Sequence, residues 1–204
     1  MPSNQLLPNR RSLVIAILLL ATALILAVVS LTWPGNLPTS TGKALVGGPF
    51  TMVNHKGETV TEKSFAGKYM LLFFGFTFCP DVCPTELQVM SAALDQLGSK
   101  ADNITPILVS VDPARDTPQV LASYVENFHP RLVGLTGTPE QVAAMAKAYK
   151  VFYAKVENAE RPQDYLMDHS SILFLMAPDG SFVKHFSYST DVAALVEGIK
   201  QAIE

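Results

Sequence analysis

The sequence is poor in cysteine, in charged residues and in basic runs, and each shortage argues against a class of protein. Two cysteines among 204 residues cannot form a disulfide scaffold or a four-cysteine zinc site. Charged residues make up only 16% of the chain and hydrophobic residues 49%, which argues against intrinsic disorder. No run is rich in lysine or arginine and the net charge is −3, so we expect no nucleic-acid partner.

A long hydrophobic run, by contrast, lies near the N-terminus. Residues 12–33 contain no charge, and residues 13–31 are Leu, Ile, Val and Ala apart from one Thr and one Ser. As a helix, the latter run would extend about 28 Å, close to the roughly 30 Å hydrocarbon core of a bilayer. We therefore expect a single transmembrane anchor at residues 12–33.

The charges that flank this run indicate its orientation. Arg10 and Arg11 precede it, so the positive-inside rule places the tail, residues 1–11, in the cytoplasm, with Trp33 at the far interface. A cleaved signal peptide is the alternative, but the run exceeds the roughly 7–15 residues of such segments and no clear cleavage site follows. The tail is too short for a mitochondrial presequence. We expect a single-pass protein of the bacterial inner membrane with its C-terminal domain in the periplasm.

The remainder of the chain is predicted to be a linker and one domain. Residues 34–49 are rich in Pro, Gly, Ser and Thr, which is typical of a linker, and residues 50–204 form the domain. Strands are expected at 50–53, 59–61, 69–76, 104–111, 131–135, 151–156, 170–176 and 182–186, and helices at 84–97, 117–128, 138–149 and from a Ser189 or Thr190 cap to the C-terminus. This order indicates an α/β fold, a thioredoxin-like mixed central sheet flanked by helices.

Both cysteines lie between the apolar strand and the helix that follows it, in the segment FTFCPDVCP, residues 76–84. A helix N-terminus favours a thiolate, which is the form that attacks disulfides and binds metals. Two inert buried thiols are the alternative, and the pairing of the only two cysteines at a sheet edge argues against it. Three intervening residues, one more than in Cys-x-x-Cys, give a turn wide enough to hold a metal between the sulfurs.

A third ligand is needed because two thiolates leave a metal under-coordinated, and the histidines are the candidates. His55, His129 and His185 fall in predicted turns, loops or an edge strand, so we expect them at the surface. His169 directly precedes an apolar strand, at a junction that lies beside the cysteine turn in a thioredoxin-like sheet. Two sulfurs and one imidazole suit copper in either oxidation state. Asp168 either orients the imidazole or caps the turn.

The segment VDPARDTP, residues 111–118, ends a strand at the same edge of the sheet. Asp116 or Thr117 is expected to cap the following helix, and Arg115 can pair with Asp112. The aromatic residues beside the cysteines, Phe76 and Phe78, either shield the site or, the interpretation we favour, pack in the core.

These segments together resemble the Sco/SenC family of copper-binding, membrane-anchored, thioredoxin-like proteins. The resemblance covers about residues 45–204 and the anchor. It is carried by GFTFCPDVCP (75–84), SVDPARDTP (110–118), GLTGT (134–138) and DHS (168–170). It implies that Cys79, Cys83 and His169 are ligands of copper, as Cu(I) or Cu(II). It also implies a role at the copper-A centre of cytochrome c oxidase subunit II, by delivery of copper or by reduction of its cysteines.

Our hypothesis is a membrane-anchored metallochaperone that delivers copper to cytochrome c oxidase subunit II, or to a similar copper enzyme, by ligand exchange with the acceptor's thiols. An upstream copper donor protein is an expected partner. The alternative is a thiol–disulfide reductase in which Cys79 attacks and Cys83 resolves. A peroxidase that uses Cys79 is a weaker third hypothesis, with Arg115 as the only basic partner for the thiol.

Overall fold

In the computed structural model, residues 10–32 and 46–203 are described, and the chain divides into two units, Met1–Lys43 and Ala44–Glu204. The first unit contains helix α1 (Arg10–Thr32). Within the ranges described, no helix combines the length and the hydropathy that a membrane span requires, so the transmembrane anchor expected at residues 12–33 is not confirmed. Trp33 and most of the predicted tail (1–11) and linker (34–49) lie outside the described residues.

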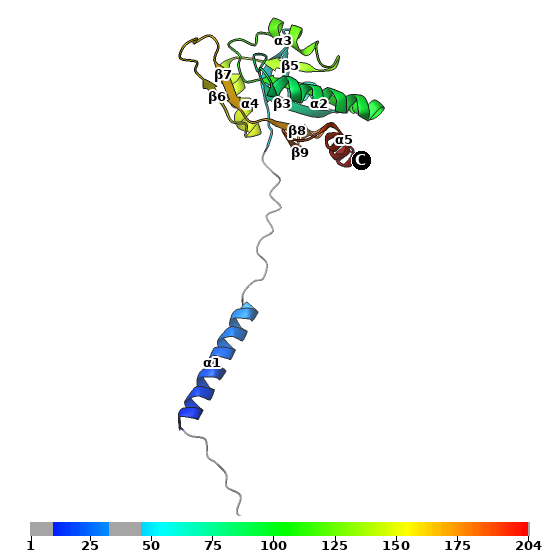
Figure 1. Cartoon of the computed structure of the whole chain (residues 1–204). Helices are drawn as coiled ribbons and strands as arrows, with labels where there is room; N and C mark the ends of the chain where they lie inside the picture. The colour runs from blue at the N-terminus through cyan, green and yellow to red at the C-terminus, as the bar shows by residue number, and fades with distance from the viewer. Residues whose placement is uncertain (1–9, 33–45, 204) are drawn as a thin grey trace, which may run out of the picture. The chain divides into compact units, whose positions relative to one another are not determined.

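The second unit is built on a seven-stranded mixed sheet (Figure 1), as the order of predicted elements indicates. Across the sheet the strand order is β2-β1-β5-β4-β3-β8-β9. The strands are β1 (Thr51–Asn54), β2 (Thr59–Thr61), β3 (Tyr69–Gly75), β4 (Ile104–Ser110), β5 (Val133–Thr136), β8 (Ile172–Met176) and β9 (Phe182–Ser187). Strands β3, β4 and β5 run parallel, and the other neighbours pair antiparallel. This is the mixed α/β sheet that the sequence predicts.

The central strand β3 is buried on both faces, as its continuous apolar run predicts. Successive side chains of a strand point to opposite faces. The ring of Phe74 meets Tyr149 of α4 (Pro139–Tyr149), which places α4 on one face of the sheet. A side chain at Gly75 would contact both Phe73 and Cys83, and Cys83 belongs to α2 (Val82–Leu97). Helix α2 therefore lies on the other face of the sheet.

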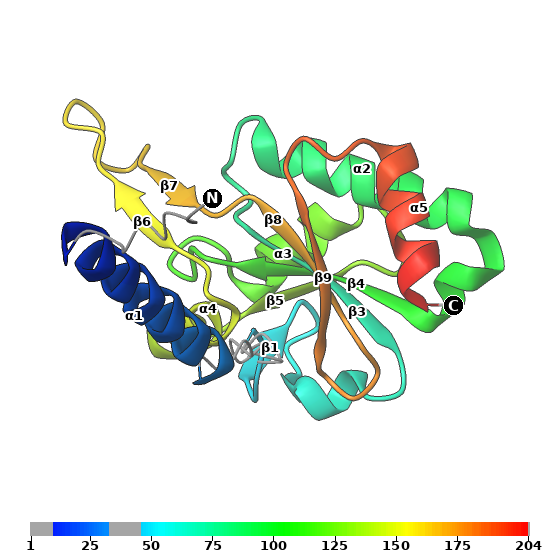
Figure 2. The same cartoon turned by 90° about the horizontal axis from the view of Figure 1, so that it is seen from below.

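Two further helices complete the layers around the sheet. Helix α5 (Val192–Ile203) packs against α2, and α3 (Pro118–Val125) packs against β5. Short 3-10 turns, η1 (Glu62–Phe65) and η2 (Gly98–Asn103), lead into β3 and β4. Figure 2 shows α2 and α5 side by side over the sheet.

Of the two predicted helix caps, that of α3 is confirmed at Thr117 and that of α5 is wrong. The Thr117 hydroxyl accepts from the backbone N–H of Val120 at the start of α3, and Thr138 forms a capping box with Gln141 at the start of α4. At α5 the expected Ser189 or Thr190 cap is wrong. The cap is Asp191, one residue after Thr190, and its carboxylate accepts from the Ala194 N–H. Helix α3 also ends at Val125, three residues earlier than expected.

A small second sheet is the part of the fold that the sequence does not predict. Strand β6 (Tyr153–Val156) pairs antiparallel with β7 (Leu166–His169), and neither belongs to the main sheet. We call this hairpin, residues 153–169, the arm, and it extends away from the main sheet in both views (Figures 1 and 2). Strand β7 has only four residues, too short to show a hydrophobic period of its own.

Gly75 gives a prediction about the fold beneath the cysteines. A methyl group there would lie 2.8 Å from Phe73 Cε1 and 2.9 Å from Cys83 Sγ, two side chains that are fully buried. We expect Gly75→Ala to lower the free energy of unfolding by about 1–3 kcal/mol, the usual cost of overpacking a core, measured by urea denaturation. In a Cys83→Ala background the sulfur is gone, so the same substitution should cost less. An equal cost in both backgrounds would contradict this contact.

Candidate metal centre

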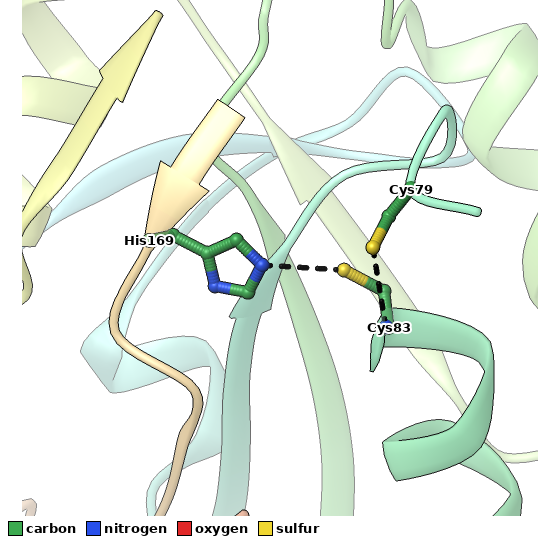
Figure 3. A group of neighbouring side chains, drawn as sticks. All are labelled: Cys79, Cys83 and His169. Carbon is green, nitrogen blue, oxygen red and sulfur yellow. Dashed lines mark hydrogen bonds between the residues drawn. The ribbon is translucent and has the colours of Figure 1, made fainter. Parts of the chain in front are cut away.

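Three segments far apart in the sequence bring their side chains together at the carboxyl end of β3. Cys79 lies in the loop of residues 76–81 between β3 and α2, which we call the cysteine loop, and Cys83 lies in the first turn of α2. His169 is the last residue of β7. The two Sγ atoms and a ring nitrogen of His169 all lie within 4.8 Å of one another (Figure 3). The structure thus groups the three residues that the sequence singles out.

The imidazole of His169 is held by an aromatic wall. Its ring meets the rings of Phe73 and Phe76 edge-on, with centroid distances of 5.8 and 5.9 Å. Its Nδ1 lies 3.4 Å from the carbonyl oxygen of Ser170, which can only accept, so the proton belongs on Nδ1. The lone pair of Nε2 then faces Cys83 Sγ, 3.4 Å away, as a donor ligand must (Figure 3).

The two cysteines differ in charge state. The hydrogen bond from the Cys83 side chain lowers the pKa of Cys79 to about 4, outweighing partial burial, and the N–H groups of Cys83 and Asp81 assist. The same hydrogen bond, together with burial, raises the pKa of Cys83. Both cysteines are free of disulfide bonds, Cys83 buried and Cys79 partly exposed. The pair at neutral pH is therefore an accessible thiolate beside a buried thiol.

Asp116 has a role that the sequence analysis missed. Of the two expected caps of α3, Thr117 is the one used, and Asp116 makes other contacts. Its fully buried carboxylate accepts from the Thr77 backbone N–H (3.1 Å), the Thr77 hydroxyl (2.6 Å) and the Ser110 hydroxyl (2.6 Å). Burial raises the pKa of Asp116, and these hydrogen bonds act against that rise. Asp116 thereby fixes the start of the cysteine loop, a role carried across 39 residues that no local pattern reveals.

The residues that flank the ligands match the expectations only in part. Phe76 is buried, as expected of core packing, but Phe78 is 59% exposed and lies 4.6 Å from the Arg115 guanidinium carbon. The predicted ion pair of Arg115 with Asp112 is present. Asp168 is exposed and neighbours His169 along β7, so its side chain points to the opposite face. Within the part of the chain that the structure describes, its side chain makes no hydrogen bond that would orient the imidazole or cap the turn.

The other three histidines lie outside the group. His185 is exposed, as expected, and stacks on Phe182. His55 accepts at Nδ1 from the Gly134 N–H. The expectation that His129 lies at the surface is wrong, because it is only 8% exposed and accepts from the N–H of Arg131. Burial lowers the pKa of His129, and the nearby Arg131 charge acts in the same direction.

The fold and this group of side chains define a class of protein, a thioredoxin-like domain with two sulfurs and one imidazole grouped at the carboxyl end of a central strand. That donor set is soft and of low charge, which suits copper better than the hard, oxygen-seeking cations.

The chain belongs to the SCO1/SenC family, whose model matches residues 38–204. It is 46% identical over 165 residues to the mitochondrial Protein SCO1 homolog 1 of Arabidopsis thaliana, covering 80% of this chain and 49% of that protein. It is 35% identical over 193 residues to an SCO2-like protein of Rickettsia prowazekii, covering 92% and 94%. The chain thus spans about half the length of the Arabidopsis relative and nearly all of the rickettsial one.

Solved structures show the same fold. The crystal structure of Arabidopsis thaliana ScoI with copper bound matches with a TM-score of 0.74 and 44% identity, over 78% of this chain and 98% of that one. The structure of BsSco, a member of the Sco family of cytochrome c oxidase assembly proteins with a disulfide switch, matches with a TM-score of 0.60 and 28% identity, over 76% and 91%. Copper is therefore a ligand of this family, and Cys79, Cys83 and His169 form a possible site for it here.

The charge state of Cys79 gives a prediction that needs no metal. With a pKa of about 4, its alkylation rate by iodoacetamide should fall only as the pH approaches that value, because the thiolate is the reactive form. Between pH ~6 and ~8 the rate should stay constant, whereas an ordinary thiol with a pKa near 8.5 gains about tenfold per unit. Peptide mass spectrometry follows the modification at each cysteine.

The matched variant is Cys83→Ala, which removes the hydrogen bond that stabilises the thiolate. Its Cys79 should react more slowly at pH ~6 than the unmodified protein does, since its pKa rises toward the ordinary value. A rate that climbs steadily through this pH range in the unmodified protein would contradict the thiolate assignment.

Proposed function

We propose that the domain is a copper chaperone that holds copper through Cys79, Cys83 and His169 and hands it to another protein. The observation that carries the proposal is the convergence of three soft donors from the cysteine loop, α2 and β7. Copper in structures of relatives supports it. Copper is cargo in this function and not a resident cofactor.

The three ligands meet copper(I) in different protonation states. Cys79 offers a thiolate without further change, Cys83 releases one proton when its sulfur binds, and His169 offers the Nε2 lone pair. Transfer then needs no redox step: an acceptor thiolate binds copper, one protein ligand leaves, and the exchange repeats until the ion has moved. The Cys83 thiol recovers its proton when the copper departs.

We propose further that the acceptor is the copper-A centre of cytochrome c oxidase subunit II, or a similar copper enzyme, and that a copper donor protein loads the site. Support comes from BsSco, which belongs to a family of cytochrome c oxidase assembly proteins. A copper-A centre is itself built with cysteine thiolates, the chemistry that ligand exchange from two cysteines requires.

The second candidate is a thiol–disulfide reductase that keeps the acceptor's cysteines reduced. The observation in its favour is the accessible Cys79 thiolate beside the buried Cys83 thiol, a pair suited to attack and resolution. A peroxidase has less support, because Asp112 and Tyr165 already engage Arg115, the basic partner such a reaction needs.

The two candidates predict different copper binding. We expect the reduced full chain to bind one copper(I) tightly in competition with a chromophoric chelator, and His169→Ala to weaken binding about 10–100-fold. The exposed His185 supplies a matched control, because His185→Ala removes an imidazole remote from the group and should leave the affinity unchanged. Weak binding that is equal in all three proteins would favour the reductase.

We also propose that the helix at Arg10–Thr32 fixes the domain to a bacterial inner membrane, with the domain in the periplasm. The support is the sequence alone: an uncharged run of 22 residues at positions 12–33, preceded by Arg10 and Arg11. A tethered domain would meet a membrane-bound acceptor without searching the whole compartment.

Cell fractionation tests this anchor. We expect the full chain to stay with carbonate-washed membranes, and a Leu20→Arg, Leu24→Arg variant to be released, because each central arginine costs about 2.5–3.5 kcal/mol in the bilayer. Intact mass spectrometry of the membrane-bound protein should show the whole chain. A shorter mass that lacks the hydrophobic run would identify a cleaved signal peptide instead.

A further inference from the structure

The arm carries one of the three ligands, yet it is not a part of the main sheet. His169 lies at the end of β7, whose ladder partner is β6 alone. A two-stranded hairpin is marginally stable by itself in water, so its position relative to the main sheet depends on side-chain contacts. Where His169 sits relative to the two sulfurs therefore depends on what holds the arm.

Arg115, in the loop between β4 and α3, contacts the arm through both the ring and the backbone carbonyl of Tyr165. Its guanidinium carbon lies 3.6 Å from the centroid of the Tyr165 ring, and its Nη1 donates to the Tyr165 carbonyl oxygen at 2.9 Å. Tyr165 directly precedes β7. Lys155 Nζ, from β6, lies 4.2 Å from the centroid of the same ring, so two cations contact Tyr165.

Asp112 makes this contact rigid. Its carboxylate accepts from Arg115 Nε through Oδ2 and from the Tyr165 hydroxyl, at 2.8 Å, through Oδ1. The Asp112 side chain is only 4% exposed and that of Arg115 is 15% exposed, so solvent screens the pair weakly. The three side chains close a ring of contacts that fixes the plane of the guanidinium.

The same guanidinium reaches the cysteine loop. Its carbon lies 4.6 Å from the ring centroid of Phe78, the residue before Cys79, and 5.9 Å from that of Phe76. Within the described residues its Nη2 is buried with no hydrogen-bond partner, so the aromatic rings take the place of polar partners there. Phe78 is 59% exposed, so this contact holds a side chain that lies largely at the surface.

We propose that Arg115 is a positioning residue that clamps the arm to the cysteine loop and so sets the distance between His169 and the two sulfurs. The clamp consists of Arg115, Asp112, Tyr165 and Phe78. It touches the neighbour of one ligand and the segment that leads into another, while making no contact with the ligand atoms themselves. The inference deepens the proposed copper site and rests on it for its functional meaning, but the clamp itself exists in the metal-free protein.

The first test uses hydrogen–deuterium exchange on the metal-free full chain. Arg115→Ala should speed amide exchange in β6 and β7 by about tenfold or more, because local opening of the arm becomes easier, while β3 and β4 stay protected. Arg131→Ala is the matched control, since Arg131 also donates to a backbone carbonyl, that of Ala101, but lies away from the site. Exchange in the arm that is unchanged by Arg115→Ala would overturn the clamp.

Tyr165 variants keep the test valid if removal of Arg115 leaves Asp112 unpaired and unfolds the domain. Tyr165→Leu removes the ring and the hydroxyl but keeps the Arg115–Asp112 pair, and it should loosen the arm. Tyr165→Phe keeps the ring under the guanidinium and should loosen it less. Arg115→Lys keeps the charge but not the planar fork, so it should not restore full protection. Equal exchange in Tyr165→Leu and the unmodified protein would contradict the proposal.

The second test asks whether Arg115 acts through His169. Copper(I) competition is measured for Arg115→Ala, His169→Ala and the double variant. Each single change should weaken binding about 10–100-fold, as for residues that orient a ligand, and the double variant should be no weaker than His169→Ala. Additive losses would show that Arg115 does not act through His169. If the unmodified chain binds no copper, the proposed function fails, and the exchange experiment still decides the clamp.

Discussion

The contact of Cys83 with the end of β3 is the constraint on which the rest of the site depends. The sulfur fits there because Gly75 has no side chain, and a methyl group in its place would lie 2.9 Å away. With Cys83 buried against β3, the first turn of α2 is fixed, the N–H of Cys83 reaches the Cys79 sulfur, and the Cys83 sulfur faces His169. The electrostatic properties of the cysteine pair therefore depend on the close approach of α2 to β3.

Two kinds of support surround this contact, and they differ in character. Above the central strand the imidazole packs in T-shaped contacts with Phe73 and Phe76, an apolar surface that limits its rotation. On the side of β4 the support is polar: Asp116 ties Thr77 to Ser110, and Asp112 ties Arg115 to Tyr165. The loop after β4 thus supplies one carboxylate to the cysteine loop and another to the arm, from residues only four apart in the chain.

Much of the fold and the grouping of the candidate ligands follow from local patterns in the sequence. Continuous apolar runs locate β3 and β4, Thr-Pro pairs locate the starts of α3 and α4, and strand order places His169 beside the cysteines. Three of the failures involve long-range contacts. Strand β7 exists because β6 pairs with it, Asp116 accepts bonds from a residue 39 positions away, and His129 is buried by neighbours that its local sequence does not reveal. Periodicity and capping describe neighbours along the chain, whereas these features depend on neighbours in space.

The unequal exposure of the two sulfurs has a kinetic consequence. A protein that approaches this surface meets Cys79 first, since Cys83 is buried beneath it. We therefore expect exchange of a metal–sulfur or a sulfur–sulfur bond at this pair to begin at the outer sulfur, that of Cys79. Burial thus gives two side chains of the same type different accessibility to an approaching protein.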